Sequence, residues 1–316
     1  MKTLLAGAAA LGLTVAFAPA ALAQETGGEQ FVLISHAPDS DSWWNTIRNA
    51  IALAADELDV TVDYRNPPTG DLADMARIVE QSAAAQPDGI IVTIADFDVL
   101  SGPIRAAVDQ GIPVITINSG TAEQSAELGA LMHVGQPERE AGRLAGERAK
   151  EEGATSFVCV NHYITNPASV ERCQGFAEGL GVELGSSMID AGQDPAQIQN
   201  TVSAYLTANQ DVDAILALGP TSAEPTIRAL ADQGLSGDDI VFATFDLSAE
   251  IAQGIRNDVV DFAIDQQPFL QGYLPVVFLT NYARYGVIPS NDVNSGPGFI
   301  TIDNLDQVEA LAGQYR

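Results

Sequence analysis

Short apolar runs rich in β-branched residues alternate along the chain with segments of helical periodicity. In its first part the pattern predicts strands at 31–35, 60–64, 89–93 and 113–117, and helices at 43–58, 72–84 and 99–110. Short strands that alternate with helices are typical of βαβ units, in which the strands pair in parallel.

The same pattern then starts again. It predicts strands at 131–134, 156–160, 187–191, 214–218, 240–244, 261–264 and 298–302, and helices at 138–151, 168–179, 195–208, 222–233, 249–256, 269–285 and 305–312. Two successive sets of βα units indicate an α/β fold of two doubly wound parallel-sheet lobes. No low-complexity linker separates the sets, so we expect short crossing strands to join the lobes around a central cleft. Open sheets of this kind bind ligands beyond the carboxyl ends of their strands.

The composition excludes some partners. The 316 residues include 14 Lys and Arg against 42 Asp and Glu, a formal net charge of −28. Nucleic acids and anionic membranes need clustered cations, so neither is an expected partner. Hydrophobic residues make up 46% of the chain, which is enough for a large core. We expect the acids to lie on a solvated surface, except for Asp41 and Asp246.

The first 23 residues have the pattern of a secretory signal peptide. Lys2 precedes an apolar run, and Ala21-Leu22-Ala23 forms a small-residue cleavage site before Gln24. A membrane anchor would need a span of about 20 apolar residues and a charged stop, which this segment lacks. No cysteine lies near the cleavage point, so lipid attachment there is not expected. The mature chain is predicted to be soluble and exported to the periplasm.

The two cysteines and three histidines bear on disulfide and metal chemistry. Cys159 lies in a predicted strand and Cys173 in the helix that follows it. An even number of cysteines in an oxidising compartment favours a disulfide, although two separate buried thiols fit the same sequence. His36, His133 and His162 show no metal-ligand spacing, so no metal site is expected.

Sequence motifs for catalysis are missing. The chain has no phosphate-binding loop, no dinucleotide fingerprint after its first strand, no nucleophile elbow and no H-E-x-x-H zinc motif. We therefore expect neither an enzyme nor a bound cofactor.

Two adjacent tryptophans, Trp43 and Trp44, stand just beyond the first strand, two residues after Asp41. Neighbouring residues on a helix point about 100° apart, so both indoles cannot enter one core face. Indole faces pack well against the C–H faces of sugars, and planar polar groups bond sugar hydroxyls in pairs. At least one Trp is therefore expected to contact a ligand. Packing in the core or an interface is the alternative.

Polar side chains also follow the later strands. Asp96 and Asp98 follow the third strand, and we expect Asp98 to cap the next helix. Asn118, Ser119, Asp246 and Gln266 also follow predicted strands. Arg172 lies on the helix after a strand, and an ion pair on the surface is an alternative role for it. Turn and helix-cap chemistry explains only some of these polar residues.

Five segments occur in an order and spacing that resemble a known family. They are "DGIIVTIAD", "QGIPVITINSG", "ERCQGFAEGL", "FATFD" and "AIDQQPFLQGY". Together they resemble the periplasmic sugar-binding proteins of ABC importers, in the ribose-binding, type I subfamily. The resemblance covers about residues 30–302. It implies an N-terminal lobe of residues 30–134 plus 267–297 and a C-terminal lobe of 135–266 plus 298–316.

The resemblance also implies the ligand contacts. The positions that match are Asp41, Trp43, Trp44, Thr93, Asn118, Arg172, Asp246 and Gln266. Apart from these matches, further candidates for ligand contact are His36, Asp96, Ser119 and Gln193. The ribose binder's Asp-Arg is replaced by Asn118-Ser119, its Asn-Asp by Gly219-Pro220, and an aromatic expected near Gln193 is missing. These departures favour a different monosaccharide or a polyol over ribose.

The predicted function is capture of a sugar or polyol by lobe closure and its delivery to an ABC permease. Hinges are expected near Gly135, Gln266 and Pro297, and the protein is expected to be monomeric. Two alternatives stay open. One is an exported receptor of the same fold that signals to a chemoreceptor or sensor kinase, and the other is a secreted α/β enzyme.

Overall fold

The computed structural model describes residues 27–316 of the chain. The predicted signal peptide, residues 1–23, and its cleavage site lie outside the described residues. Within 27–316, no helix combines the length and the apolar character needed to cross a bilayer.

The N-terminal lobe contains a six-stranded sheet in the order β2-β1-β3-β4-β5-β11, and every neighbouring pair is parallel. The strands are β1 (Gln30–Ile34), β2 (Thr61–Arg65), β3 (Gly89–Val92), β4 (Val114–Ile117), β5 (Met132–Gly135) and β11 (Val293–Asn294). Its helices are α1 (Trp44–Leu58), α2 (Leu72–Ala84), α3 (Phe97–Asp109), α4 (Ala122–Glu127) and α10 (Pro268–Tyr285).

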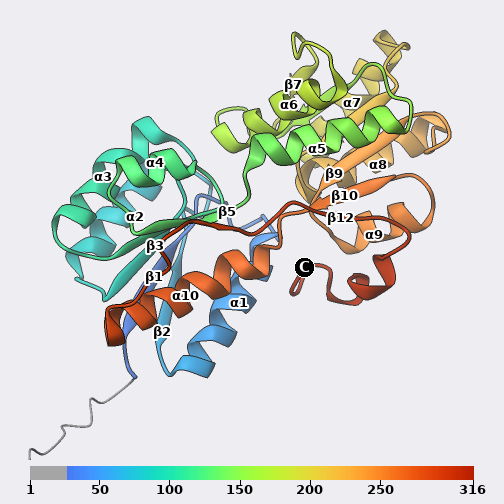
Figure 1. Ribbon diagram of the computed structural model, residues 1–316. Coiled ribbons are helices and arrows are strands. Elements are labelled where there is room, and N and C mark those ends of the chain that lie inside the picture. Colours follow the sequence, from blue (N-terminus) through green and yellow to red (C-terminus); the bar gives the residue numbers. More distant parts are fainter. Residues whose placement is uncertain (1–26) are drawn as a thin grey trace, which may run out of the picture.

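Alternation along β1 divides this lobe's core into two layers. Phe31 and Leu33 pack in the cluster with α1 and α10, whereas Val32 and Ile34 pack in the cluster with α2 and α3. Successive residues of a strand point to opposite faces, so a strand covered on both faces reads as a continuous apolar run. The helices therefore cover both faces of the sheet (Figure 1).

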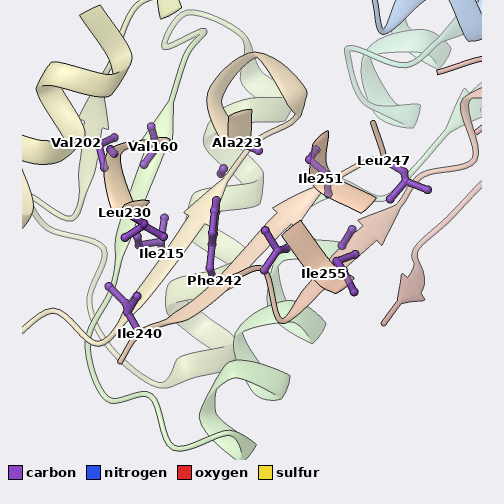
Figure 2. Packing of buried hydrophobic residues seen from close by; sticks show 14 of the residues in the cluster. Val160, Val202, Ile215, Ala223, Leu230, Ile240, Phe242, Leu247, Ile251 and Ile255 are labelled. Carbon is purple, nitrogen blue, oxygen red and sulfur yellow. The ribbon is translucent and has the colours of Figure 1, made fainter. Parts of the chain in front are cut away.

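The C-terminal lobe repeats the arrangement with the order β7-β6-β8-β9-β10-β12. Its strands are β6 (Val158–Asn161), β7 (Met188–Asp190), β8 (Ala214–Ala217), β9 (Val241–Phe245), β10 (Phe262–Asp265) and β12 (Gly298–Ile300). Its helices are α5 (Glu138–Glu151), α6 (Pro167–Leu180), α7 (Pro195–Ala208), α8 (Pro220–Gln233) and α9 (Ala249–Arg256). The edge strand β12 is antiparallel to β10, and the other pairs are parallel. Figure 2 shows the layer in which Phe242 and Ile215 of the sheet meet Leu230 of α8.

The predicted α/β fold of two parallel-sheet lobes is confirmed, with three local differences. Helix α4 and the two-residue strand β11 were not predicted, because neither is long enough to show a periodicity. The helix predicted at 305–312 is two 3₁₀ turns, Leu305–Gln307 and Glu309–Leu311.

Helices α5 and α6 approach each other unusually closely. Gly142 and Gly146 of α5 face Gly175 and Gly179 of α6, and a Cβ at any of the four would overlap a backbone oxygen of the other helix. Glycine permits this because it has no side chain. The two backbones are therefore in direct contact.

A disulfide joins Cys159 of β6 to Cys173 of α6, as the even cysteine count predicted. Both side chains are fully buried in the apolar cluster between α5, α6 and the sheet. The disulfide thus fixes α6, which carries Arg172, to the centre of its lobe.

The chain passes between the two sheets three times: after β5, after β10, and between β11 and β12 (Figure 1). Gly135, Gln266 and Pro297, the positions predicted as hinges, lie at these crossings.

Candidate functional site

A cavity of about 300 Å³ lies between the lobes. The N-terminal lobe contributes residues that follow β1 and β4, and the C-terminal lobe contributes residues that follow β6, β8 and β9. The volume is near the lower end of the range of about 300–1,000 Å³ typical of small-molecule sites. The polar and aromatic residues of the cavity wall include His36, Asp41, Trp43, Trp44, Asn118, Ser119, His162, Tyr163, Asn166, Arg172, Gln193, Asp246 and Gln266.

The two tryptophans contribute differently to the cavity wall. Trp44 is only 2% exposed and packs in the apolar core, whereas Trp43 is half-buried at the helix start. Their rings meet edge to face, with centroids 5.1 Å apart. Both indoles line the cavity, and Trp43 offers the more accessible aromatic surface because its side chain is less buried.

Asp41 organises the start of α1. Its Oδ1 accepts a hydrogen bond from the backbone N–H of Trp43 at 3.1 Å. Burial raises the pKa of Asp41 to about 6, against the opposing effects of that N–H and of Arg48. A carboxylate therefore faces the cavity beside the indole at neutral pH.

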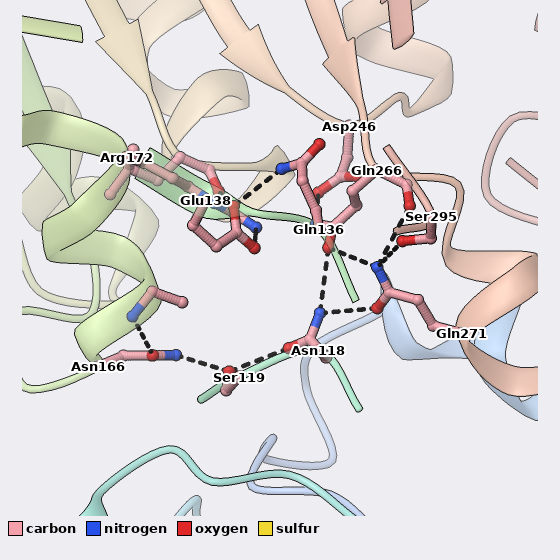
Figure 3. Close-up of polar contacts among 12 residues, drawn as sticks. Asn118, Ser119, Gln136, Glu138, Asn166, Arg172, Asp246, Gln266, Gln271 and Ser295 are labelled. Carbon is pink, nitrogen blue, oxygen red and sulfur yellow. Dashed lines mark hydrogen bonds and ion pairs between the residues drawn. The ribbon is translucent and has the colours of Figure 1, made fainter. Parts of the chain in front are cut away.

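Asn118 connects the two lobes through a buried polar network (Figure 3). Its Nδ2 donates to Oε1 of Gln266 at 3.2 Å and to Oε1 of Gln271 at 3.1 Å. Ser119 donates to Oδ1 of Asn118, and Nδ2 of Asn166 in the other lobe donates to Ser119, each at 3.0 Å. Asn118 has a left-handed φ of 58°, which asparagine tolerates better than most residues.

Asp246 directly follows β9 and faces this network from the C-terminal lobe. Its Oδ2 accepts a hydrogen bond from Nε2 of Gln266 at 2.7 Å. Burial raises the pKa of Asp246 to about 7, and the positive charge of Arg172 and the bond from Gln266 only partly oppose the rise. The carboxyl is therefore near the midpoint of its titration at neutral pH.

Two buried atoms of the cavity have no protein hydrogen-bond partner: Nε1 of Trp43 and Oδ1 of Asp246. They belong to opposite lobes and lie close together, since a weak hydrogen bond from the Trp43 N–H is among the effects that lower the pKa of Asp246. One atom donates and the other accepts. A hydroxyl can do both, so one that entered between the two side chains would satisfy the two atoms together.

Arg172 is held by an unpredicted partner. Its Nε donates to Oε2 of Glu138 at 2.6 Å and its Nη2 to Oε1 at 2.7 Å, while Nη1 donates to the carbonyl of Leu218 at 3.0 Å (Figure 3). The guanidinium also lies 4.1 Å from the ring centre of Phe245. The alternative of surface pairing is wrong, because α6 packs with this face against the lobe.

Three other predicted positions lie at the edge of the site or outside it. Thr93 does not line the cavity; it is fully buried and bonds Nδ1 of His36, which does, at 3.0 Å. Asp96 accepts a bond from the N–H of Val99 and caps α3, a role that the sequence assigned to Asp98. Gln193 is exposed at the rim of the cavity.

Sequence reasoning missed His162, Tyr163 and Asn166, which follow β6 and line the cavity. The signal was available, because these polar residues also follow a predicted strand. The ring of Tyr163 lies 5.5 Å from that of His36 across the lobes. Burial lowers the pKa of His162 to about 4, so this ring is neutral at pH 7.

The prediction that only Asp41 and Asp246 escape the solvated surface is wrong. Glu138 and Asp265 are also buried, each with a hydrogen-bonded arginine. Across residues 27–316, no group of three or more His, Cys, Asp or Glu side chains is arranged to hold a metal ion.

Comparison with known proteins places the chain in a family. A family model described as periplasmic binding protein domain matches residues 31–286. The crystal structure of a carbohydrate transporter from Acidothermus cellulolyticus, in complex with myo-inositol, is 32% identical, with a TM-score of 0.84 over 91% of this chain and 99% of that chain.

Two curated relatives are more distant. The xylose/arabinose-binding protein of Sulfolobus acidocaldarius is 25% identical over 82% of this chain and 67% of its own length. The ribose import binding protein of Escherichia coli is 22% identical over 85% of this chain and 88% of its own. The chain therefore belongs to the periplasmic binding protein family, a family of solute-binding proteins rather than of enzymes.

Proposed function

We propose that this protein captures an uncharged monosaccharide or cyclic polyol between its lobes and delivers it to an ABC permease. The observation that carries the proposal is the unpartnered pair in the cavity, the N–H of Trp43 and Oδ1 of Asp246. A hydroxyl bridges such a pair, and the adjacent indole face suits the C–H face of a sugar ring. The cavity volume of about 300 Å³ favours one sugar ring over an oligosaccharide.

The relatives support this ligand class. Their names refer to xylose, arabinose and ribose, and the neighbour that is 32% identical holds myo-inositol. Asn118 and Ser119 bring an amide and a hydroxyl to the cavity without adding charge. A neutral ligand rich in hydroxyls matches these groups.

Closure is the proposed mechanism. The lobes, 30–134 plus 267–297 and 135–266 plus 298–316, would rotate about the three crossings. The bond between Asn166 and Ser119 and the contact between His36 and Tyr163 join the lobes directly. A ligand that contacts both lobes shifts the population toward the closed form by its differential affinity for the two forms. The proposed location is the periplasm, after removal of residues 1–23.

A thermal-shift panel tests the proposal. It contains myo-inositol, pentoses and neutral hexoses, with amino acids as the contrasting class. A ligand present at 100 times its Kd is expected to stabilise the protein by about 2.7 kcal/mol. A response to amino acids with none to any hydroxylated ligand would refute the proposed function.

Variants then test the residue assignment. Trp43→Ala and Arg172→Ala should each weaken binding of the ligand that the panel identifies. Tyr285→Ala, at an aromatic that is 63% exposed and does not line the cavity, should leave affinity unchanged. Unchanged affinity in both cavity variants would show that the site lies elsewhere.

A further inference from the structure

Arg172 is a buried cation in the wall of the cavity, and its charge is already matched. Its side chain is 8% exposed and that of Glu138 is 2% exposed. Three of its five N–H groups are used, two by Glu138 and one by the carbonyl of Leu218. Glu138 occupies the edge formed by Nε and Nη2, and one N–H on each of Nη1 and Nη2 remains for a ligand, so the guanidinium can still donate hydrogen bonds although its charge is matched.

The other ionisable groups of the cavity add no free positive charge. Burial lowers the pKa of His36 to about 3 and that of His162 to about 4, so both rings are neutral at pH 7. Arg228 lies at the rim and is paired with Glu250 at 2.7 Å. The remaining groups of the wall that can carry charge are acids, among them Asp41 and Asp246.

The position of the Glu138 carboxylate is fixed by the crossing from β5 and by the packing of α5 against α6. It is the first residue of α5, directly behind the crossing from β5, and Nε2 of Gln136 in that crossing donates to its Oε2 at 2.8 Å. The facing glycines of α5 and α6 bring the two backbones together, so the short span between Glu138 and Arg172 is set by helix packing. The carboxylate is therefore a fixed part of the site.

We propose that Glu138 determines specificity: it positions the guanidinium of Arg172 and cancels its charge, so that the cavity accepts uncharged polyols and rejects their carboxylate analogues. The proposal rests on the proposed function. An anionic ligand would face the acids of the wall without a free cation to compensate, and such like-charge contacts are a common means of rejecting a wrong partner.

The test compares matched ligands that differ in one carboxylate. D-glucose and D-glucuronate, and D-galactose and D-galacturonate, are titrated calorimetrically into the wild type, Glu138→Gln, Glu138→Asp and Glu29→Gln. Glu29→Gln is the matched control, because it frees Arg284 from a similar bidentate pair that does not line the cavity. The readout is the ratio of the two Kd values within a pair, since a merely structural role would change both affinities together.

The wild type should bind a neutral sugar at least about 100-fold more tightly than its acid, and Glu138→Gln should reduce that ratio at least about tenfold. Glu138→Asp keeps the charge, so it should keep the ratio even where affinity falls. Glu29→Gln should keep the ratio as well, because Arg284 does not line the cavity.

Three results would overturn the role of Glu138: equal wild-type affinity for both members of a pair, an unchanged ratio in Glu138→Gln, or a ratio lost in Glu138→Asp. If Glu138→Gln does not fold, equal wild-type affinity for both members of a pair, or a ratio lost in Glu138→Asp, would still overturn the proposal. Absence of binding to every neutral sugar and to myo-inositol would instead refute the proposed function.

Discussion

The disulfide between Cys159 and Cys173 is expected to stabilise the C-terminal lobe. The two residues are 14 apart in sequence, so the bond closes a loop of 15 residues. Loop-closure entropy then predicts a stabilisation of about 3 kcal/mol. Replacing both cysteines with alanine should lower the free energy of unfolding of the C-terminal lobe by about this amount. Alanine is chosen because serine would bury two hydroxyls in an apolar cluster.

Urea denaturation followed by two probes measures the effect. Trp43 and Trp44 are the only tryptophans and lie in the N-terminal lobe, whereas far-UV circular dichroism reports both lobes. A loss of about 3 kcal/mol shifts the urea midpoint by about 1 M or more, since the urea dependence is about 1–3 kcal/mol/M. If the lobes unfold separately, the fluorescence transition should stay in place while the dichroism transition moves.

A reducing agent supplies the control. It should shift the wild type by the same amount and leave the double alanine variant unaffected. A midpoint that moves by less than about 0.2 M in both probes would refute stabilisation by loop closure.

Three further predictions follow from the fold, the site and the leader. Gly146→Ala should destabilise the C-terminal lobe by about 1–3 kcal/mol or more in urea melts, because its methyl group would meet the backbone of α6. Gly102→Ala, in the open part of α3, should instead be neutral or stabilising by up to about 1 kcal/mol, and equal effects would contradict the packing argument. The pKa of Asp246 is raised from 3.8 to about 7 in the folded state, so its contribution to stability falls as pH rises from about 4 to about 7. Asp246→Asn should therefore gain stability relative to the wild type between pH 4.5 and 7.5 in thermal melts, and a constant difference would contradict this. Mass spectrometry of the exported protein should give an N-terminus at Gln24, and a mature chain that retains residues 1–23 would contradict the leader assignment.

The helices were predictable because their signals are local. The ranges 72–84, 138–151, 195–208 and 249–256 agree with α2, α5, α7 and α9 to the residue. Apolar spacing and capping chemistry act between residues three or four apart, so a single pass along the chain contains them. Helix α4 was not found because its signal is the capping box at Thr121 and not a period.

The candidate site was predictable where residues follow a strand. Asn118, Asp246 and Gln266 all line the cavity, because the carboxyl ends of parallel strands converge on one edge. Thr93 and Asp96 also follow a strand but do not enter the cavity. The side chain of Thr93 is buried in the core, and that of Asp96 caps α3.

The sequence thus determined the order of elements, the two-lobe plan and most strand-end residues, because each depends on near neighbours along the chain. Which acids are buried, and which cations pair with them, depends on the tertiary structure. Glu138 and Arg172 are 34 residues apart, and nothing local to either indicates the other. They meet because glycines let α5 and α6 approach, and the pairing with Arg172 offsets the cost of burying the Glu138 carboxylate.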